Sequence, residues 1–252
     1  MIEICAIASG SNGNCYYVGN ENTAILVDAG ISGKQILIRM EQKNLNPNKV
    51  KAIFISHEHN DHFRCVKALS KKTGAPVYLT SQTLESSWKR HRPKDIILFK
   101  PGEIVAIDDI SVHTFLKMHD AIEPCSFRIE HNGLSIGVFT DIGEPCENVI
   151  NHLNKCQALF LESNYDEEML WAGSYPYFLK KRITSEYGHL SNIQAKKLLK
   201  EHQNPALQIV LLSHLSQENN RPEIALSTFD EFKDKFRVEV TNRYEVGEVF
   251  VI

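Results

Sequence analysis

One short segment carries four side chains that can bind metal ions. Residues 52–62 read AIFISHEHNDH, so His57, His59, Asp61 and His62 fall within six positions of one another. Neutral imidazoles supply nitrogen ligands for zinc and similar ions, and a carboxylate adds a hard oxygen and negative charge. His57 and His59 can converge on one ion from a tight loop, whereas Asp61 and His62 point towards a neighbouring position. The spacing therefore predicts two bound metal ions.

The residues before this cluster predict the strand that positions it. Residues 52–55 are apolar and mostly β-branched or aromatic, which suits a strand covered on both faces. In open α/β sheets, ligands bind at the carboxyl ends of the strands. A polar surface loop would explain one histidine here more easily than three histidines and an aspartate. We therefore expect the cluster at the carboxyl edge of a buried sheet.

Other predicted strands also end in side chains that can bind a metal. His119, Asp141 and His214 each follow an apolar run that predicts a strand. A carboxylate at the end of a buried strand is costly unless charge or hydrogen bonds compensate, so Asp141 needs a functional explanation. The predicted strands are residues 2–7, 15–18, 24–27, 52–55, 76–80, 104–107, 110–116, 126–131, 134–140, 156–162, 208–212, 236–242 and 248–252, and the predicted helices are residues 32–43, 63–74, 192–202 and 222–235.

Composition limits the class of protein. The 252 residues contain no linker between two halves, so we expect a single domain over residues 1–252. The 28 basic and 31 acidic residues leave a net charge of −3, which excludes a general polycation and restricts any nucleic-acid contact to a local patch. The six cysteines form no Cys-x-x-Cys pair, and no apolar run reaches the ~18 residues of a membrane helix. We therefore expect a cytoplasmic protein with reduced thiols and no membrane contact.

Two polar segments are candidates for substrate binding. The SGSNGN loop, with Ser11 and Asn14, permits positive φ and a close approach of the backbone to a ligand, although a simple hairpin turn explains it equally well. Trp88, Lys89 and Arg90 place an aromatic ring beside basic groups, which could stack a base and bind a phosphate backbone. A solvated charged surface is the alternative for this second segment.

The pattern His-x-His-x-Asp-His at residues 57–62 resembles the signature of the metallo-β-lactamase superfamily. Further segments look like the bacterial WalJ/YycJ branch of that superfamily, and they span nearly the whole chain. These segments are SGSNGN (9–14), HEHNDH (57–62), MHDA (118–121), FTDIG (139–143), ESNYD (162–166), YPYFLKKRI (175–183), GHLSN (188–192) and LSHLSQENNRPE (212–223).

The resemblance implies an α/β fold, the four-layered αββα sandwich, and a set of seven metal ligands. It places one metal on His57, His59 and His119, a second on Asp61, His62 and His214, and Asp141 between the two metals. It also implies that Asp28 orients a ligand from beneath. Zinc, manganese or iron would each suit such mixed histidine and aspartate sites.

The resemblance also implies a mechanism. Two ions ~3.5–4 Å apart hold a hydroxide near neutral pH, and this hydroxide would attack the phosphodiester beside Asp61 and Asp141. His189 is the candidate general acid for the leaving group, because the pKa of an imidazole lies near neutral pH. Binding a substrate phosphate, or a purely structural role, are the alternatives for His189. Asn164, Asp166 and Ser191, from the segments shared with the branch, are candidate substrate contacts.

Three functions compete at this point. The resemblance favours a metal-dependent 5′-to-3′ exonuclease acting on the ends of double-stranded DNA and linked to mismatch repair. The near-neutral charge favours a small-molecule phosphodiesterase, acting on a cyclic nucleotide or a nucleotide ester with the same metal core. The third candidate is a non-catalytic metal-binding partner protein, against which the complete ligand set and His189 argue. No protein partner is predicted.

Overall fold

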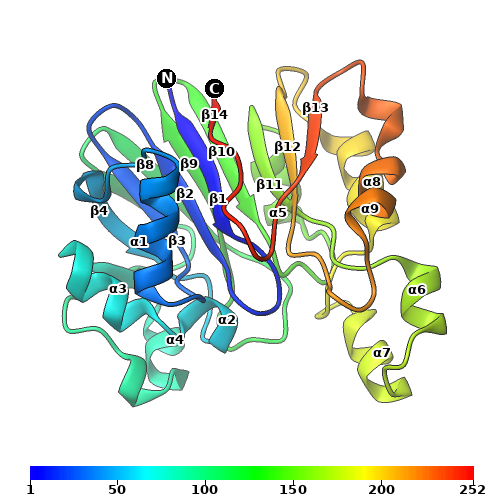
Figure 1. Ribbon diagram of the computed structural model, residues 1–252, viewed down its shortest axis with the longest axis horizontal. Coiled ribbons are helices and arrows are strands. Elements are labelled where there is room, and N and C mark those ends of the chain that lie inside the picture. Colours follow the sequence, from blue (N-terminus) through cyan, green and yellow to red (C-terminus); the bar gives the residue numbers. More distant parts are fainter.

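Two seven-stranded β-sheets pack face to face in the computed structural model, which describes residues 1–252. Helices cover the outer face of each sheet, so the chain forms four layers (Figure 1). The αββα sandwich predicted from the sequence is therefore confirmed.

The first sheet changes from antiparallel to parallel pairing at its centre. Across the sheet its strands are β14 (Phe250–Val251), β1 (Glu3–Ala8), β2 (Cys15–Gly19), β3 (Ala24–Val27), β4 (Val50–Phe54), β5 (Val77–Leu79) and β6 (Ile96–Leu98). The strands from β14 to β3 pair antiparallel, and those from β3 to β6 pair parallel. The parallel half contains β4, which leads into the histidine cluster.

The second sheet repeats this arrangement. Its strands are, in order, β13 (Arg237–Val240), β12 (Ile209–Ser213), β11 (Ala158–Glu162), β10 (Leu134–Phe139), β9 (Cys125–His131), β8 (Ile110–Leu116) and β7 (Ile104–Ile107). The strands from β13 to β10 are parallel, and those from β10 to β7 are antiparallel. Asn132 and Gly133 both have positive φ in the tight turn between β9 and β10, as a two-residue hairpin of this type requires.

The helices occur in the segments of the chain that connect parallel strands. They are α1 (Gly33–Gln42), α2 (Asn60–Phe63), α3 (Val66–Thr73), α4 (Ser81–Ser86), α5 (Glu147–Leu153), α6 (Glu167–Ala172), α7 (Tyr177–Ile183), α8 (Asn192–His202) and α9 (Pro222–Thr228), with 3-10 turns η1 (Pro47–Lys49), η2 (Lys89–His91) and η3 (Asp230–Phe232). None of these helices has both the length and the apolar composition needed to cross a lipid bilayer.

Two helices differ from the prediction. The helix expected over residues 63–74 begins only at Val66, as α3, and Phe63 instead ends the separate short helix α2. The break occurs because the amide of Cys65 donates to the Ala29 carbonyl and the amide of Ala29 donates to the His62 carbonyl. These bonds tie the end of α2 to the loop after β3. The helix expected over 222–235 stops at Thr228, after which Phe229 and Phe232 turn into the core. The sequence analysis also missed α4, α5, α6, α7 and β6.

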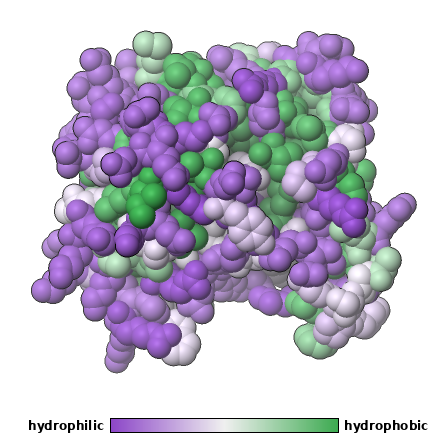
Figure 2. Space-filling view, in the orientation of Figure 1, coloured by the Kyte–Doolittle hydropathy of each residue, from purple (hydrophilic) through white to green (hydrophobic).

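Three apolar clusters hold the four layers together. One lies between the sheets and includes Phe54 and Phe127, and the other two lie between each sheet and its own helices. Burial of apolar surface on this scale is the main favourable contribution to folding. Hydrophilic atoms cover much of the surface in Figure 2, but pale and green atoms gather at its lower right, where Figure 1 places α7.

Candidate metal centre

Three polar residues lie in sharp backbone turns just after strands, and their side chains converge at one edge of the sheets. Asp28 follows β3, Asp141 follows β10 and His214 follows β12, with φ of 65°, 55° and 57°. Positive φ is uncommon for residues other than glycine, and where the surrounding structure enforces it, it often marks a functional site. The buried parallel strands therefore fix these three residues at the carboxyl edge of the two sheets.

Three histidines form one group of potential metal ligands. His57, His59 and His119 each offer a ring nitrogen, and these atoms all lie within 4.8 Å of one another. Nδ1 of His57 lies 2.9 Å from the Ser56 hydroxyl, and Nδ1 of His119 lies 3.1 Å from the Gly188 carbonyl. Burial lowers the pKa of His57 and lowers that of His119 to about 3. Both rings are therefore neutral near pH 7, as metal ligands must be.

A second group lies beside the first and is richer in carboxylates. Asp61, His62 and His214 also bring ligand atoms within 4.8 Å of one another. The Asp28 carboxylate lies beneath this group, with Oδ2 2.7 Å from Nδ1 of His62, so Nε2 of that ring faces Asp61. Burial opposes a charge on the histidines, but nearby carboxylates, above all Asp141, raise the pKa of His62 and raise that of His214 to about 10.

Asp141 lies between the two groups. Its Oδ2 is 3.2 Å from Nε2 of His62, and its Oδ1 is 3.9 Å from Nε2 of His119 and 3.3 Å from Nδ1 of His214. Burial would raise the pKa of this carboxyl group, but His214 and His62 lower it well below its usual range. Asp141 is thus a buried carboxylate anion that faces both groups of histidines.

Unsatisfied polar atoms test whether these residues fit bound metal ions. His119 Nε2, His214 Nε2 and Asp141 Oδ2 are buried and have no partner with hydrogen-bond geometry. Most buried polar atoms in proteins are paired, so three unpaired nitrogen and oxygen atoms that converge on one place indicate a ligand. Imidazole nitrogens and carboxylate oxygens are the donors that zinc, manganese and iron accept. The donor set therefore fits divalent metal ions.

Glu162, at the end of β11, is a further buried carboxylate beneath this centre. Its Oε1 lies 2.8 Å from Nδ1 of His189 and 2.9 Å from Nδ1 of His214, and its Oε2 accepts the amide of Ile142. Burial would raise its pKa, but His189 and His214 lower it to about 2. The sequence analysis gave Glu162 no role, although the argument applied to Asp141, a carboxylate at a buried strand end, also covers Glu162.

His189 stands on the rim of the centre. Its ring centroid lies 5.3 Å from those of both His119 and His214, and its Nδ1 lies within hydrogen-bond distance of the Glu162 carboxylate. The side chain is partly exposed and lines the cavity above the metal ligands. His189 therefore presents Nε2 to whatever enters that cavity.

The cavity itself has a volume of about 270 Å³. Besides metal ligands and His189, it is lined by Ser11, Asn164 and Ser216, by the pair Asp120 and Arg182, and by Tyr175, Leu179 and Ile183. The structure thus brings Ser11 and Asn164 of the predicted substrate contacts to the cavity. The residues of and beside α7 were not among the predicted contacts, and the YPYFLKKRI segment was the signal available for them.

The other predicted substrate contacts lie elsewhere. Asn14 is buried beneath the centre, with its amide nitrogen 3.1 Å from His62 Nε2, because the SGSNGN loop folds inward over Asp61. Asp166 accepts the amide of Met169 and caps α6, and Ser191 is buried as the cap of α8. Asn14, Asp166 and Ser191 therefore lie outside the cavity lining, and their contact with substrate stays a prediction.

Trp88, Lys89 and Arg90 form an exposed basic and aromatic group at η2. The Arg90 guanidinium lies 5.0 Å from the centre of the Trp88 ring. None of the three residues lines the cavity. Their contact with nucleic acid stays a prediction.

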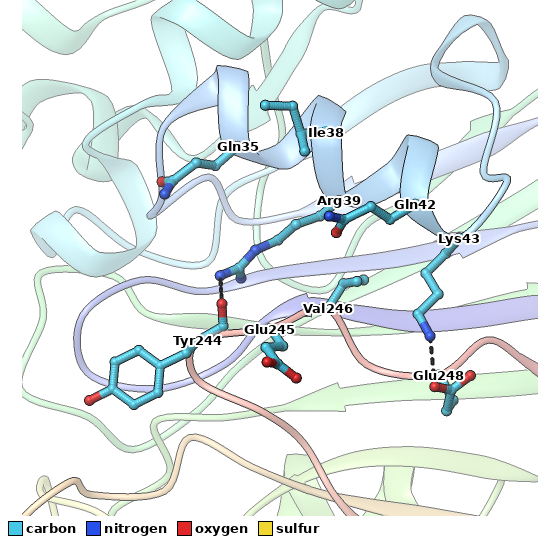
Figure 3. Close-up of a pocket in the computed structure, with 9 residues that line it drawn as sticks. All are labelled: Gln35, Ile38, Arg39, Gln42, Lys43, Tyr244, Glu245, Val246 and Glu248. Atoms are coloured by element: carbon cyan, nitrogen blue, oxygen red, sulfur yellow. Dashed lines mark hydrogen bonds and ion pairs between the residues drawn. The ribbon is translucent and has the colours of Figure 1, made fainter.

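A larger groove between α1 and the C-terminal segment, of about 550 Å³, does not share the features of the metal centre (Figure 3). Lys43 and Glu248 form an ion pair of 2.6 Å across it, and Arg39 donates to the carbonyl of Tyr244. No unpaired buried polar atom lies along this groove. Its charged groups stabilise the attachment of the C-terminal segment.

Comparison with known proteins agrees with this geometry. Residues 8–174 match the family described as the metallo-beta-lactamase superfamily. The chain is 32% identical to "Exodeoxyribonuclease YycJ" of Bacillus anthracis over 256 aligned residues, which cover 100% of this chain and 94% of that protein. It is 33% identical to "Exodeoxyribonuclease WalJ" of Streptococcus pneumoniae, with 88% of this chain and 84% of that protein covered.

Solved structures share the fold at low sequence identity. The metallo-beta-lactamase fold protein YhfI from Bacillus subtilis superposes with a TM-score of 0.74 at 18% identity, and the alignment covers 100% of both chains. Zn²⁺-bound PqqB from Methylobacterium extorquens gives a TM-score of 0.72 at 12% identity, covering 99% of this chain and 100% of that one. Fold, ligand pattern and sequence identity agree: the chain is a metal-dependent hydrolase that belongs to the WalJ/YycJ branch of the metallo-β-lactamase superfamily.

Proposed function

We propose that this protein is a dinuclear phosphodiesterase that digests DNA from a double-stranded end in the 5′-to-3′ direction. The observation that carries the proposal is that seven candidate ligand residues converge at one place, three of them with a buried atom that has no hydrogen-bond partner. The chain is also similar to exodeoxyribonucleases along almost its whole length. In this scheme His57, His59 and His119 would hold one ion, Asp61, His62 and His214 would hold the other, and Asp141 faces both groups of ligands.

Bound divalent ions, whether zinc, manganese or iron, would supply an activated water molecule and positive charge for the phosphate oxygens. Side chains of the protein itself fix the orientation of the histidine ligands. Asp28 holds Nδ1 of His62 and Ser56 contacts Nδ1 of His57, so the opposite nitrogen of each ring points at the centre. Such partners fix the ring orientation of a metal ligand and raise its basicity.

His189 is the residue we propose as general acid. The Glu162 carboxylate lies 2.8 Å from its Nδ1 and fixes the orientation of the ring, while Nε2 faces the cavity. A proton on Nε2 can pass to the leaving oxygen as the phosphodiester bond breaks. Glu162 is therefore a positioning residue for His189.

A small-molecule phosphodiesterase is the second candidate, and the size of the cavity favours it. A volume of about 270 Å³ accommodates one phosphodiester group and its immediate substituents. For a DNA substrate, by contrast, most of the contacts would lie outside the cavity, on the surrounding surface.

An end-labelled linear duplex tests the two candidates. The purified protein would be incubated with this duplex and manganese or zinc, and in parallel with bis(p-nitrophenyl) phosphate. His59→Ala, which removes one ligand, serves as the inactive control. We expect loss of the 5′ label only with intact His59. Ester cleavage without DNA digestion would instead support the small-molecule phosphodiesterase.

A further inference from the structure

The hairpin formed by α6 and α7 exposes three aromatic side chains next to the metal centre. Trp171, Tyr177 and Phe178 are 45%, 67% and 74% exposed. The pale and green atoms at the lower right of Figure 2 lie over this hairpin. Single exposed apolar residues are ordinary, but large ones grouped together mark a binding surface.

The backbone that carries these rings is held in place. Lys180 is buried between the two helices, and its ammonium donates to the carbonyls of Trp171 and Gly173 at 2.8 and 2.7 Å. Asp166 caps the start of α6 through the amide of Met169. The hairpin therefore presents its aromatic side chains from a fixed position.

The charge on this surface indicates what it binds. The Lys181 ammonium lies 5.9 Å from the centre of the Trp171 ring and 5.7 Å from that of Tyr177, whose rings are themselves 6.3 Å apart. Flat aromatic rings combined with a cation suit a nucleic-acid strand, because bases stack on the rings and phosphates pair with the cation.

Helix α7 connects this surface to the metal cavity. Tyr177 and Lys181 lie one turn apart on the helix, and Phe178 lies one turn before Arg182, because residues i and i+4 share a face. Leu179, Arg182 and Ile183 form a second set. The second set lines the cavity, where Arg182 pairs with Asp120 beside His119. A DNA strand with one phosphodiester in the metal cavity would therefore have its neighbouring nucleotides within reach of the exposed rings.

We propose that the aromatic face of α6 and α7 stacks unpaired bases at the DNA end whose phosphodiester enters the metal cavity. This inference rests on the proposed nuclease function and adds where the bases bind. The Trp88 and Arg90 pair has similar chemistry, but it does not line the cavity. Only the α7 surface shares a helix with the reacting site.

The test compares DNA binding with ester cleavage. Tyr177→Ala combined with Phe178→Ala removes two rings that contact no metal ligand. A duplex with a short single-stranded overhang and phosphorothioate ends would be titrated by fluorescence anisotropy. Stacking contributes about 1–3 kcal/mol per base, so we expect about 5- to 150-fold weaker binding. Hydrolysis of bis(p-nitrophenyl) phosphate should be unchanged.

Tyr244→Ala is the matched control, because Tyr244 is 64% exposed but lies in the groove of Figure 3 rather than at the metal cavity. It should leave both measurements unchanged.

If the wild type digests DNA while the double variant binds the overhang as tightly as the wild type does, the stacking inference alone fails. If the double variant keeps its DNA affinity but changes from dimer to monomer on size exclusion, the face binds a second copy of the chain. A wild type that cleaves the ester but neither binds nor digests DNA would overturn the proposed function and the inference with it.

Discussion

Two clusters of histidines and charged residues, one mostly buried and one half-buried, differ in whether their buried polar atoms are paired. One is the metal centre. The other, which we call the Arg128 cluster, contains His113, Arg128, Glu130, Ser135 and His152 on β8, β9, β10 and α5. In the Arg128 cluster the guanidinium donates to Glu130 at 2.6 Å, to Ser135 at 2.7 Å and to His152 at 3.3 Å. The His113 ring lies 3.3 Å from the Glu130 carboxylate.

The comparison shows that histidine content alone does not identify a ligand site. No side-chain atom of the Arg128 cluster is both buried and without a hydrogen-bond partner, and the His152 ring stacks on Phe115 with the ring centroids 4.0 Å apart. At the metal centre three buried polar atoms, on His119, Asp141 and His214, remain unpaired. Unpaired buried atoms are costly, so a protein keeps them where a ligand completes them.

The largest expected effect follows from removing the carboxylate that faces both histidine groups. Asp141→Ala should lower metal occupancy and nuclease activity together, the activity by about 10³-fold or more, because metal ions contribute several kcal/mol of transition-state stabilisation. Metal analysis and DNA digestion measure the two effects. Glu130→Ala, a carboxylate of the Arg128 cluster, is the control and should retain both. Full occupancy in Asp141→Ala would remove its bridging role.

A smaller effect is expected at the rim of the centre. His189→Ala should leave both metals bound while turnover falls by about 10²-fold or more, the scale of lost acid–base assistance. Turnover is measured on DNA, and metal content on the same preparation. His113→Ala changes a histidine of the Arg128 cluster and should not affect turnover. A His189→Ala variant with normal turnover would exclude this residue from the mechanism.

The strands and helices that were predicted are those that depend on the local pattern of residues. Apolar runs predicted most strands, and the helices expected over residues 32–43 and 192–202 are present as α1 and α8. The resemblance supplied the seven ligands, which the structure brings together. These features are encoded over a few neighbouring residues, so a single sequence is enough to find them.

What the sequence did not predict depends on contacts between distant segments. Asn14 turns inward because its backbone amide donates to the Asp61 carbonyl, 47 positions away in the chain. Glu162 acquires its role only where β11 brings it beneath His189 and His214. The position of the α7 aromatics beside the cavity likewise depends on the buried contacts of Lys180. Side-chain direction at such positions follows tertiary packing rather than local propensity.

The smallest expected effect tests the Arg128 cluster through pH. Burial lowers the pKa of His152 to about 4, so the folded protein keeps this ring neutral while the unfolded chain binds a proton below about pH 6.5. The stability that the neutral ring contributes is therefore complete above pH 6.5 and is lost as the pH falls towards 4. His152→Gln keeps an acceptor for Arg128 but does not titrate. The stability difference between wild type and variant, from urea unfolding at each pH, should shrink by at most about 1.4 kcal/mol per pH unit, the limit for one proton. A stability difference that is constant from pH 7 to pH 4 would mean that His152 titrates alike in the folded and unfolded states. DNA digestion at neutral pH should be the same for wild type and variant, because this cluster lies outside the metal centre.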